Sequence, residues 1–225
     1  MVHLVGHSLG AHIMAYVANN VTGIARITGL DPAQPAFEGS DPLVYLDASD
    51  ADFVDIVHSN GDPFVPNGGF GFIEPIGDVD FYMNGGATQP GCPGVTPKGP
   101  ITLLINSLAD LFITPIDLIV QYAACSHSRA FEYFTEAIAS NCTFWGHKWN
   151  FNTPVPIEER CSPEFCPMMG KMTQLLPHRG SFYVQTNPKP PYCIPQPDSE
   201  TVLTQNNWES QPDIVDEDEE SAKSP

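Results

Sequence analysis

The stretch VHLVGHSLGAH, from Val2 to His12, decides the fold class of this chain. A short apolar run leads into Gly6-His7-Ser8-Leu9-Gly10, a Gly-x-Ser-x-Gly pattern, and a segment of helical character follows. In this setting a serine lies on a sharp turn between a strand and a helix, and the two glycines relieve crowding there. The pattern predicts an exposed Ser8 hydroxyl above a helix N-terminus, with the Leu9 N–H directed at a developing oxyanion. An ordinary glycine-rich turn is the alternative.

The segments that follow favour an α/β fold with a parallel sheet. Strands are expected at residues 2–5, 25–30, 53–58 and 180–187 and a helix at 11–20, and the spacing of Phe131, Phe134 and Ile138 predicts a second helix within 126–140. Residues 62–94 are rich in glycine and proline, which predicts long loops. Strand, helix and strand in this order are typical of parallel neighbours in one sheet.

A serine hydroxyl becomes a good nucleophile when a histidine takes its proton and an acid orients that histidine. In the α/β-hydrolase fold the acid and then the histidine follow the serine along the chain. Asp31 fits the acid because it ends a predicted strand, although Asp-Pro pairs also initiate turns. Chemistry alone does not choose among the later acids. Three histidines qualify as the base on chain order: His127, His147 and His178.

Among these histidines His127 is favoured, because it is expected on a loop between an apolar segment and a helix. His58 also follows Asp31, but it closes a predicted strand and is expected to be structural. An isolated histidine is otherwise more often a hydrogen-bonded surface or core residue.

The charge of the chain is strongly negative and partly local. A net charge of −18 leaves nothing basic to meet phosphates, which excludes nucleic acid as a partner. Residues 196–225 hold nine acidic groups and one lysine, so we expect this segment to be a solvated, disordered tail. Residues 1–195 are expected to form one domain.

The cysteine pattern indicates an oxidising compartment. The six cysteines contain no Cys-x-x-Cys pair, which favours disulfides over a zinc or redox site. Two glycosylation sequons begin at Asn20 and Asn141. The sequence as given does not open with a signal peptide, so either the signal lies upstream of it or the protein is cytosolic. We favour a missing N-terminus and expect a secreted protein.

The most apolar window covers residues 101–120. A membrane-spanning helix is disfavoured there, because Asp110, Asp117 and Pro115 lie inside it and a mid-membrane Asp costs about 2.5–3.5 kcal/mol. Pro115 is expected to split the window into two short helices. The first carries an apolar stripe, which suits either a surface lid or a plain buried helix: Ile101, Leu104, Ile105, Leu108 and Phe112.

Several ordered motifs together resemble the pancreatic lipase family, from Val2 to about Cys193: VHLVGHSLGAH, ITGLDPAQPAF, LDASDADFVDIVHSN, DFYMNGG, QPGC and CSHSRA. The resemblance implies an α/β-hydrolase fold with Ser8 as nucleophile, Asp31 as orienting acid and His127 as general base. It also implies an acyl-enzyme intermediate formed from an ester of a long-chain lipid, with the enzyme acting at a lipid–water interface.

The resemblance implies further features. A structural calcium would be held by the side chains of Asp47 and Asp50 and by backbone carbonyls of Pro42 and Tyr45, although a solvated acidic loop would look much the same. No cofactor is expected for catalysis. Two disulfides are implied, Cys92–Cys125 at the ends of a lid over about residues 92–125, and Cys161–Cys166 in a small loop. The remaining two, Cys142 and Cys193, are left to pair, but sequence alone does not give connectivity.

The resemblance leaves the substrate and the activity open. A long lid goes with triacylglycerol hydrolysis in the family and a short one with phospholipase A1 activity, so triacylglycerol is favoured. A non-catalytic lipid-binding relative is the alternative from another class. The family's catalytic domain begins before its nucleophile strand, so we expect residues 1–195 to be its C-terminal part and the natural chain to be longer, with an N-terminus that is missing here. A protein cofactor is not predicted either way.

Overall fold

The computed structural model describes residues 2–64, 68–92, 116–151 and 160–196, apart from the side chains of 116–123. Residues Met1–Ile194 form one compact unit. The predicted acidic tail lies outside the described residues except at its first position. The predicted apolar stripe and the first of the two short helices expected around Pro115 also lie outside them, and the expected lid is described only at its ends. The second helix is not short, because residues 116–120 begin the 24-residue helix α3, Ile116–Ala139.

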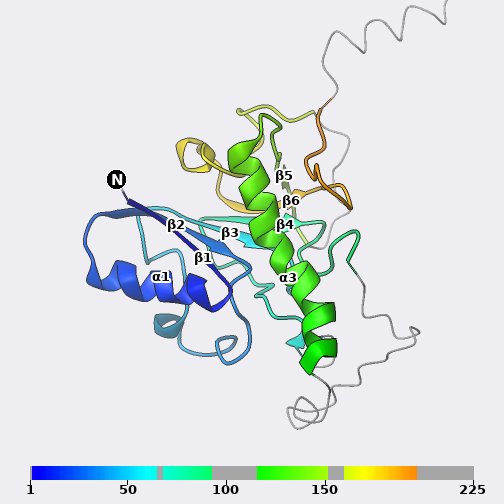
Figure 1. The fold of residues 1–225 in the computed structure, drawn as a ribbon. Helices are drawn as coiled ribbons and strands as arrows, with labels where there is room; N and C mark the ends of the chain where they lie inside the picture. The colour runs from blue at the N-terminus through cyan, green and yellow to red at the C-terminus, as the bar shows by residue number, and fades with distance from the viewer. Residues whose placement is uncertain (1, 65–67, 93–115, 152–159, 197–225) are drawn as a thin grey trace, which may run out of the picture. The chain divides into compact units, whose positions relative to one another are not determined.

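The described strands form one sheet in the order β1-β2-β3-β4-β6-β5 (Figure 1). The strands β1 to β4 and β6 run parallel, and the short β5 pairs antiparallel with β6. The parallel α/β sheet expected from the sequence is therefore present. The strand bounds are β1 Val2–His7, β2 Ile24–Leu30, β3 Val54–His58, β4 Val79–Met83, β5 His147–Lys148 and β6 Gly180–Val184.

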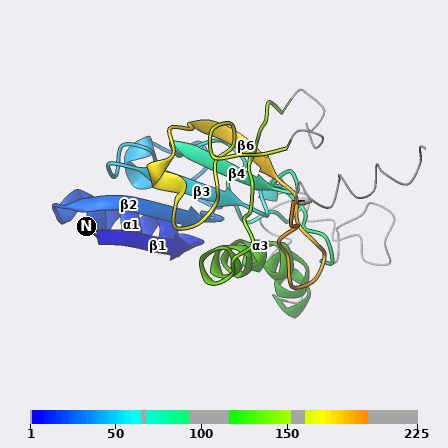
Figure 2. The same cartoon turned by 90° about the horizontal axis from the view of Figure 1, so that it is seen from above.

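In the described part of the chain, two α-helices pack on opposite faces of this sheet. Helix α1, Leu9–Asn20, lies beside β1 and β2 (Figures 1 and 2) and shares a core with Ile27 and Ile56. Helix α3, Ile116–Ala139, shares the other core with Leu30 and Val57. Successive side chains of a strand point to opposite faces of the sheet. Ile27 and Leu30 of β2 therefore point to opposite faces, as do Ile56 and Val57 of β3, which places α1 and α3 on different sides of the sheet. Two 3-10 turns, η1 Pro42–Val44 and η3 Thr173–Leu175, lie in the connections.

Two predictions about these elements are wrong. The strand β4 lies inside the segment expected to form long loops, because the five-residue run Val79–Met83 is entirely buried between its glycine-rich flanks. His127 lies within α3 rather than on a loop. The cause is local, since no glycine or proline separates residues 116 and 139 and nothing in that stretch ends a helix.

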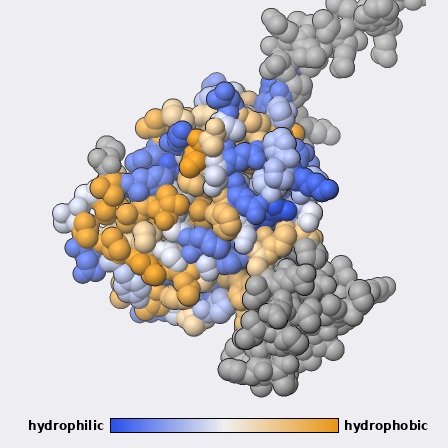
Figure 3. Space-filling model, in the orientation of Figure 1, coloured by the Kyte–Doolittle hydropathy of each residue, from blue (hydrophilic) through white to orange (hydrophobic). Residues whose placement is uncertain are grey.

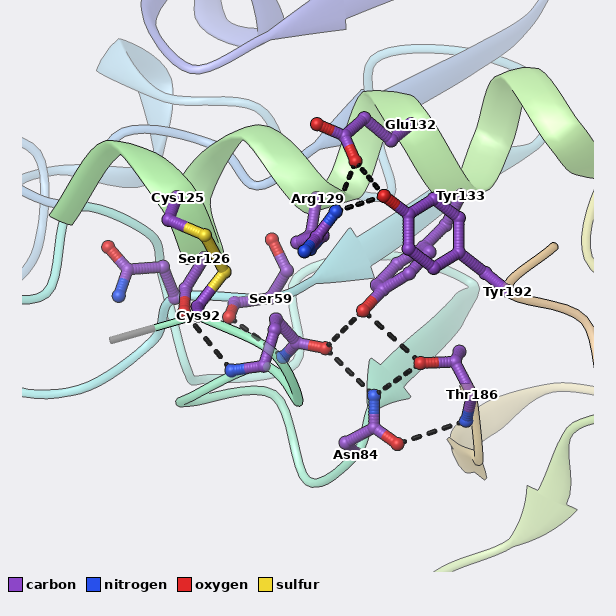
Figure 4. The surroundings of a disulfide bond; sticks show 12 residues. Ser59, Asn84, Cys92, Cys125, Ser126, Arg129, Glu132, Tyr133, Thr186 and Tyr192 are labelled. Carbon is purple, nitrogen blue, oxygen red and sulfur yellow. Dashed lines mark hydrogen bonds and ion pairs between the residues drawn. A yellow bond between two sulfur atoms is a disulfide. The ribbon is translucent and has the colours of Figure 1, made fainter. Parts of the chain in front are cut away.

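Three disulfides cross-link the described residues: Cys92–Cys125, Cys142–Cys193 and Cys161–Cys166. The first and third are the pairs that the family resemblance implies, and the second joins the two cysteines that were left over. Figure 4 shows Cys92 bonded to Cys125, which lies on α3. This bond ties the chain after β4 to the turn of α3 that carries His127.

The sheet ends at β1, and apolar residues gather on the surface over β1 and α1 (Figure 3). Several of them are about half exposed, among them Val2, Val5, Leu9, Ile13 and Tyr16. The residues described by the structure thus leave this sheet edge and the outer face of α1 uncovered. Within the same residues, no helix combines the length and the hydropathy that crossing a membrane requires.

Candidate active site

Ser8 occupies the turn between β1 and α1, as the opening pattern predicts. Its backbone has φ 56° and ψ −125°, a combination that non-glycine residues rarely adopt. The Ser8 N–H donates to the Leu30 carbonyl at 3.0 Å, which fixes the turn against the end of β2. Leu9 is the first residue of α1, so its N–H has no carbonyl partner within the helix. That N–H remains available to an oxyanion.

The two glycines of the pattern do different work. A Cβ atom on Gly6 would lie 2.3 Å from the Gly10 carbonyl oxygen, so only glycine fits at position 6. A Cβ atom on Gly10 would meet nothing within 4 Å. The expectation that both glycines relieve crowding therefore holds for Gly6 alone, and it is the backbone of Gly10 that approaches closely.

Asp31 directly follows β2 and is fully buried. Its φ of 46° turns the chain sharply away from the sheet. One carboxylate oxygen, Oδ1, accepts hydrogen bonds from the backbone N–H groups of Ser59 at 2.8 Å and Asn60 at 3.0 Å, at the end of β3. These two bonds aim the other oxygen, Oδ2, toward α3.

His127 meets that second oxygen. Its Nδ1 lies 2.6 Å from Asp31 Oδ2, and the side chain is 12% exposed while that of Asp31 is 0% exposed. Because the carboxylate accepts, Nδ1 carries the proton and Nε2 of a neutral ring is left with a lone pair. An imidazole held in this way can accept a proton from a nearby hydroxyl.

The other candidate histidines are held elsewhere. His178 Nε2 donates to the Pro163 carbonyl at 2.9 Å on the surface. His147 lies on β5, where Nδ1 is 3.6 Å from Cys161 Sγ. His147, Cys161 and Cys166 form a cluster with atoms within 4.8 Å of one another, but both sulfurs are bonded to each other. Of the three histidines that chain order allowed, the structure pairs only His127 with Asp31.

His7 connects the serine turn to the histidine, a contact that sequence analysis missed. Its Nε2–H donates to the His127 carbonyl at 3.0 Å, and the two rings lie 4.5 Å apart between centroids. Burial lowers the pKa of His7 below 6.5, which keeps the ring neutral near pH 7. Within the described part of the chain no hydrogen bond joins Ser8 Oγ to His127 Nε2. Such bonds are often long in ligand-free hydrolases and shorten when substrate binds.

A second missed feature is the segment that closes over Asp31. A Cβ atom on Gly71 would lie 2.3 Å from Asp31 Oδ1, so the bare backbone of Gly71 packs directly on the carboxylate. The Phe70 ring lies 5.8 Å from that of His127, between centroids. Asn60 holds this segment in place, because its side-chain oxygen accepts from Phe70 N at 3.0 Å and its carbonyl from Gly71 N at 3.0 Å.

Gln89 joins the strand ends to α3 and is 1% exposed. Its side-chain amide donates to the carbonyls of Ser59 at 2.9 Å and Met83 at 2.7 Å. Its backbone N–H donates to Ser126 Oγ at 3.1 Å, and its side-chain oxygen accepts from the Tyr133 hydroxyl at 3.2 Å. Ser126 precedes His127, and Ser59 contributes an N–H to Asp31. Gln89 therefore fixes both partners of the acid–histidine pair.

The four candidate calcium ligands lie in one short loop that includes η1. The Asp47 N–H donates to Asp50 Oδ2 at 2.9 Å, and the Tyr45 N–H donates to the Pro42 carbonyl at 3.4 Å. Two carboxylates and two carbonyls are the hard oxygen donors that Ca²⁺ takes, so the residues fit such an ion. Of the sequon residues, Asn20 is exposed at the end of α1 and Asn141 is exposed just after α3.

A parallel sheet with a serine on a strand–helix turn, and an Asp–His pair at neighbouring strand ends and α3, defines an α/β hydrolase. The family model described as Lipase matches residues 1–192, so the chain belongs to the lipase family, as the sequence motifs indicate.

Similar proteins include the pancreatic triacylglycerol lipases of Equus caballus, 38% identical over 201 residues, and of Homo sapiens, 39% identical over 195 residues. Each alignment covers 82% of this chain and 40% of the relative. Pancreatic lipase-related protein 2 of Sus scrofa is 40% identical over 174 residues, covering 75% of this chain and 35% of that protein. The chain thus spans about two fifths of the length of these relatives.

Proposed function

We propose that this protein is a lipase that hydrolyses the carboxylic esters of triacylglycerol. The observation that carries the proposal is the 2.6 Å hydrogen bond between His127 and Asp31 beside the strained turn of Ser8. Family membership supports ester hydrolysis. The substrate is proposed from the names of relatives, two of which are pancreatic triacylglycerol lipases.

In the proposed mechanism, Ser8 Oγ attacks the ester carbonyl carbon while His127 Nε2 takes the hydroxyl proton. The buried Asp31 carboxylate stabilises the imidazolium that forms. The Leu9 N–H donates to the oxyanion of the tetrahedral intermediate. When that intermediate collapses, the C–O bond to the glyceride breaks and the leaving alkoxide takes the proton from His127. Water then attacks the acyl-enzyme by the same steps, releasing a fatty acid and free Ser8.

We further propose where the protein acts and what it carries. The protein is secreted, and three disulfides support an oxidising compartment. It acts on lipid at a lipid–water interface. Asn20 and Asn141 carry N-linked glycans, and Asp47, Asp50 and the carbonyls of Pro42 and Tyr45 hold a structural Ca²⁺, which supplies charge neutralisation in that loop.

Two experiments distinguish a triacylglycerol lipase from a non-catalytic lipid-binding protein and from a phospholipase. The purified protein is treated with a fluorescent alkyl phosphonate, and the labelled residue is found by peptide mass spectrometry. Labelling of Ser8 in the wild type, with none in Ser8→Ala, supports a hydrolase. A folded wild-type protein that stays unlabelled supports a non-catalytic lipid-binding relative. Release of fatty acid from triolein emulsions supports triacylglycerol as substrate, whereas release only from phosphatidylcholine vesicles identifies a phospholipase.

A further inference from the structure

His58 has both of its ring nitrogens against hydrogen-bond acceptors. The side chain, at the end of β3, is 0% exposed. Nδ1 lies 2.7 Å from the Phe72 carbonyl oxygen, and Nε2 lies 2.8 Å from Asp80 Oδ1. A carbonyl oxygen can only accept, so Nδ1 carries a proton.

The proton on the other nitrogen follows from the surroundings of Asp80. Its Oδ1 also accepts from the backbone N–H of Ile76 at 3.0 Å, and the N–H of Gly77 is shared between Oδ1 at 3.3 Å and Oδ2 at 3.2 Å. Amide donors therefore face both oxygens of Asp80, which makes the group an acceptor on each side, so the proton in the contact with His58 belongs to Nε2. His58 is therefore a buried imidazolium paired with the Asp80 carboxylate.

The acceptor of Nδ1–H belongs to the segment that closes over Asp31. Phe72 follows Gly71, whose backbone packs on the Asp31 carboxylate, and Phe72 N–H donates to the Pro32 carbonyl at 2.9 Å. Tyr82 strengthens the attachment, because its ring stacks on that of His58 at 4.3 Å and its hydroxyl donates to the Ile73 carbonyl at 3.0 Å. The segment is thus held to the end of β2 on one side and to His58 on the other.

His58 also directly precedes Ser59 and Asn60, whose backbone N–H groups donate to Asp31 Oδ1. We propose that His58 is a positioning residue for the Asp31–His127 pair, an imidazolium that clamps residues 71–73 against the Asp31 carboxylate through its Nδ1–H. This inference rests on the proposed function and adds to it a residue that touches neither substrate nor reacting atoms.

Two substitutions separate the bonds that His58 makes. His58→Gln places an amide donor near the position of Nε2 and loses the bond to Phe72. His58→Asn places one near Nδ1 and loses the bond to Asp80. With 4-nitrophenyl butyrate, we expect H58Q to lower kcat by about 10²-fold, the size of loss that follows a misplacement of about 1 Å. KM should change less than twofold, and H58N should retain clearly more of kcat than H58Q.

Both variants bury an amide in place of the imidazolium and lose one bond, so a merely structural role would lower their thermal stability and leave the two kcat values alike. Equal kcat values in H58Q and H58N, or an unchanged kcat in H58Q, would overturn the clamp.

Nuclear magnetic resonance gives a readout that does not depend on activity. In the unaltered protein at pH 7, the nitrogen shifts of His58 should show both ring nitrogens protonated, and a single ring proton would contradict the imidazolium. The downfield Nδ1–H proton of His127 should be present in the wild type and in H58N and be lost in H58Q. If the wild type shows this proton but no Ser8 labelling, the proposed function fails while the clamp stands. Persistence of the proton in H58Q refutes the clamp alone.

Discussion

Asp31 and His127 lie 96 residues apart in the chain, and the carboxylate of one accepts a 2.6 Å hydrogen bond from the ring of the other. Each partner is held by a different part of the fold. Two backbone N–H groups at the end of β3 orient Asp31, while Gln89 and the disulfide Cys92–Cys125 hold the turn of α3 that presents His127. The pair is preorganised before any substrate arrives, which is the condition for efficient proton transfer.

Replacing Asp31 with asparagine should lower kcat by about 10⁴-fold, the size of loss seen when a triad acid becomes its amide. The amide oxygen can still accept from the N–H groups of Ser59 and Asn60, so the amide NH₂ faces His127 Nδ1. The imidazole then accepts at Nδ1 and carries its proton on Nε2, where it cannot take the proton of Ser8. The measurement is kcat on a soluble ester, together with a thermal melt. Asp52→Asn is the matched control, because Asp52 is exposed and should keep its wild-type rate. A D31N protein that is folded and retains a tenth of the activity would remove Asp31 from the mechanism.

The serine turn should respond very differently to alanine at its two glycines. Gly6→Ala places a methyl group 2.3 Å from the Gly10 carbonyl oxygen, a backbone overlap that costs on the order of 1–3 kcal/mol or more and displaces Ser8. Gly10→Ala adds a methyl in open space within α1 and should stabilise by roughly 0.5–1 kcal/mol. Urea unfolding and phosphonate labelling of Ser8 measure both effects. Equal losses in the two variants would show that the turn is not built as described.

Features of the site that are formed by consecutive residues can be predicted from the sequence, whereas most contacts between residues far apart in the chain cannot. The Ser8 turn needs five consecutive residues, so its pattern predicts the geometry closely. The Asp31 carboxylate is contacted by the N–H groups of Ser59 and Asn60 after β3 and by the backbone of Gly71. A glycine in a loop does not indicate from sequence which carboxylate it will contact. His7 occupies a variable place in the Gly-x-Ser-x-Gly pattern, and its role follows only from the packing of β1 against α3. The Cys142–Cys193 pair likewise requires the fold.

The stability of the protein should fall as the pH drops below about 6.5, partly through His7. Burial lowers the pKa of His7 below 6.5, its value in an unfolded chain, so the unfolded state binds a proton before the folded state does. The stability that neutral His7 contributes is fully present above pH 6.5 and is lost as the pH falls through the lowered pKa, at no more than about 1.4 kcal/mol per pH unit.

The test compares thermal melts between pH 7.5 and 5.0. His7→Gln keeps a donor toward the His127 carbonyl and cannot titrate, so its melting temperature should fall less over this range than that of the wild type. His3 and His12 also have pKa values lowered by burial, so some dependence should remain. An equal or steeper fall in H7Q would show that His7 does not contribute.

The proposed calcium site predicts a stability that depends on the ion. A ligand bound only by the folded state stabilises it by about 2.7 kcal/mol at a concentration of 100 Kd. Calcium should therefore raise the melting temperature of the wild type above that in a chelator, and Asp47→Asn or Asp50→Asn should abolish the difference. Asp52→Asn keeps the loop acidic at both proposed side-chain ligands and should respond like the wild type. A wild-type melt that is the same with calcium and chelator would argue for a solvated acidic loop.

The contribution of each disulfide to the free energy of unfolding should depend on the length of chain that it closes into a loop. Cys142–Cys193 spans 51 residues and Cys161–Cys166 spans 5. The chain-entropy relation gives about 4 kcal/mol for the first and about 2 kcal/mol for the second. Paired serine substitutions, C142S with C193S and C161S with C166S, allow the two losses to be compared by urea unfolding.

The Glu136 carboxylate moderates the larger loss, because it accepts from Tyr192 N and Cys193 N at 2.8 Å each and still holds this end of the chain to α3. We therefore expect the free energy of unfolding to fall more in C142S with C193S than in C161S with C166S. Adding Glu136→Gln to C142S with C193S should increase the difference between the two free energies. If the short loop proves the costlier one to open, strain and local packing at residues 161–166, and not unfolded-state entropy, control the effect.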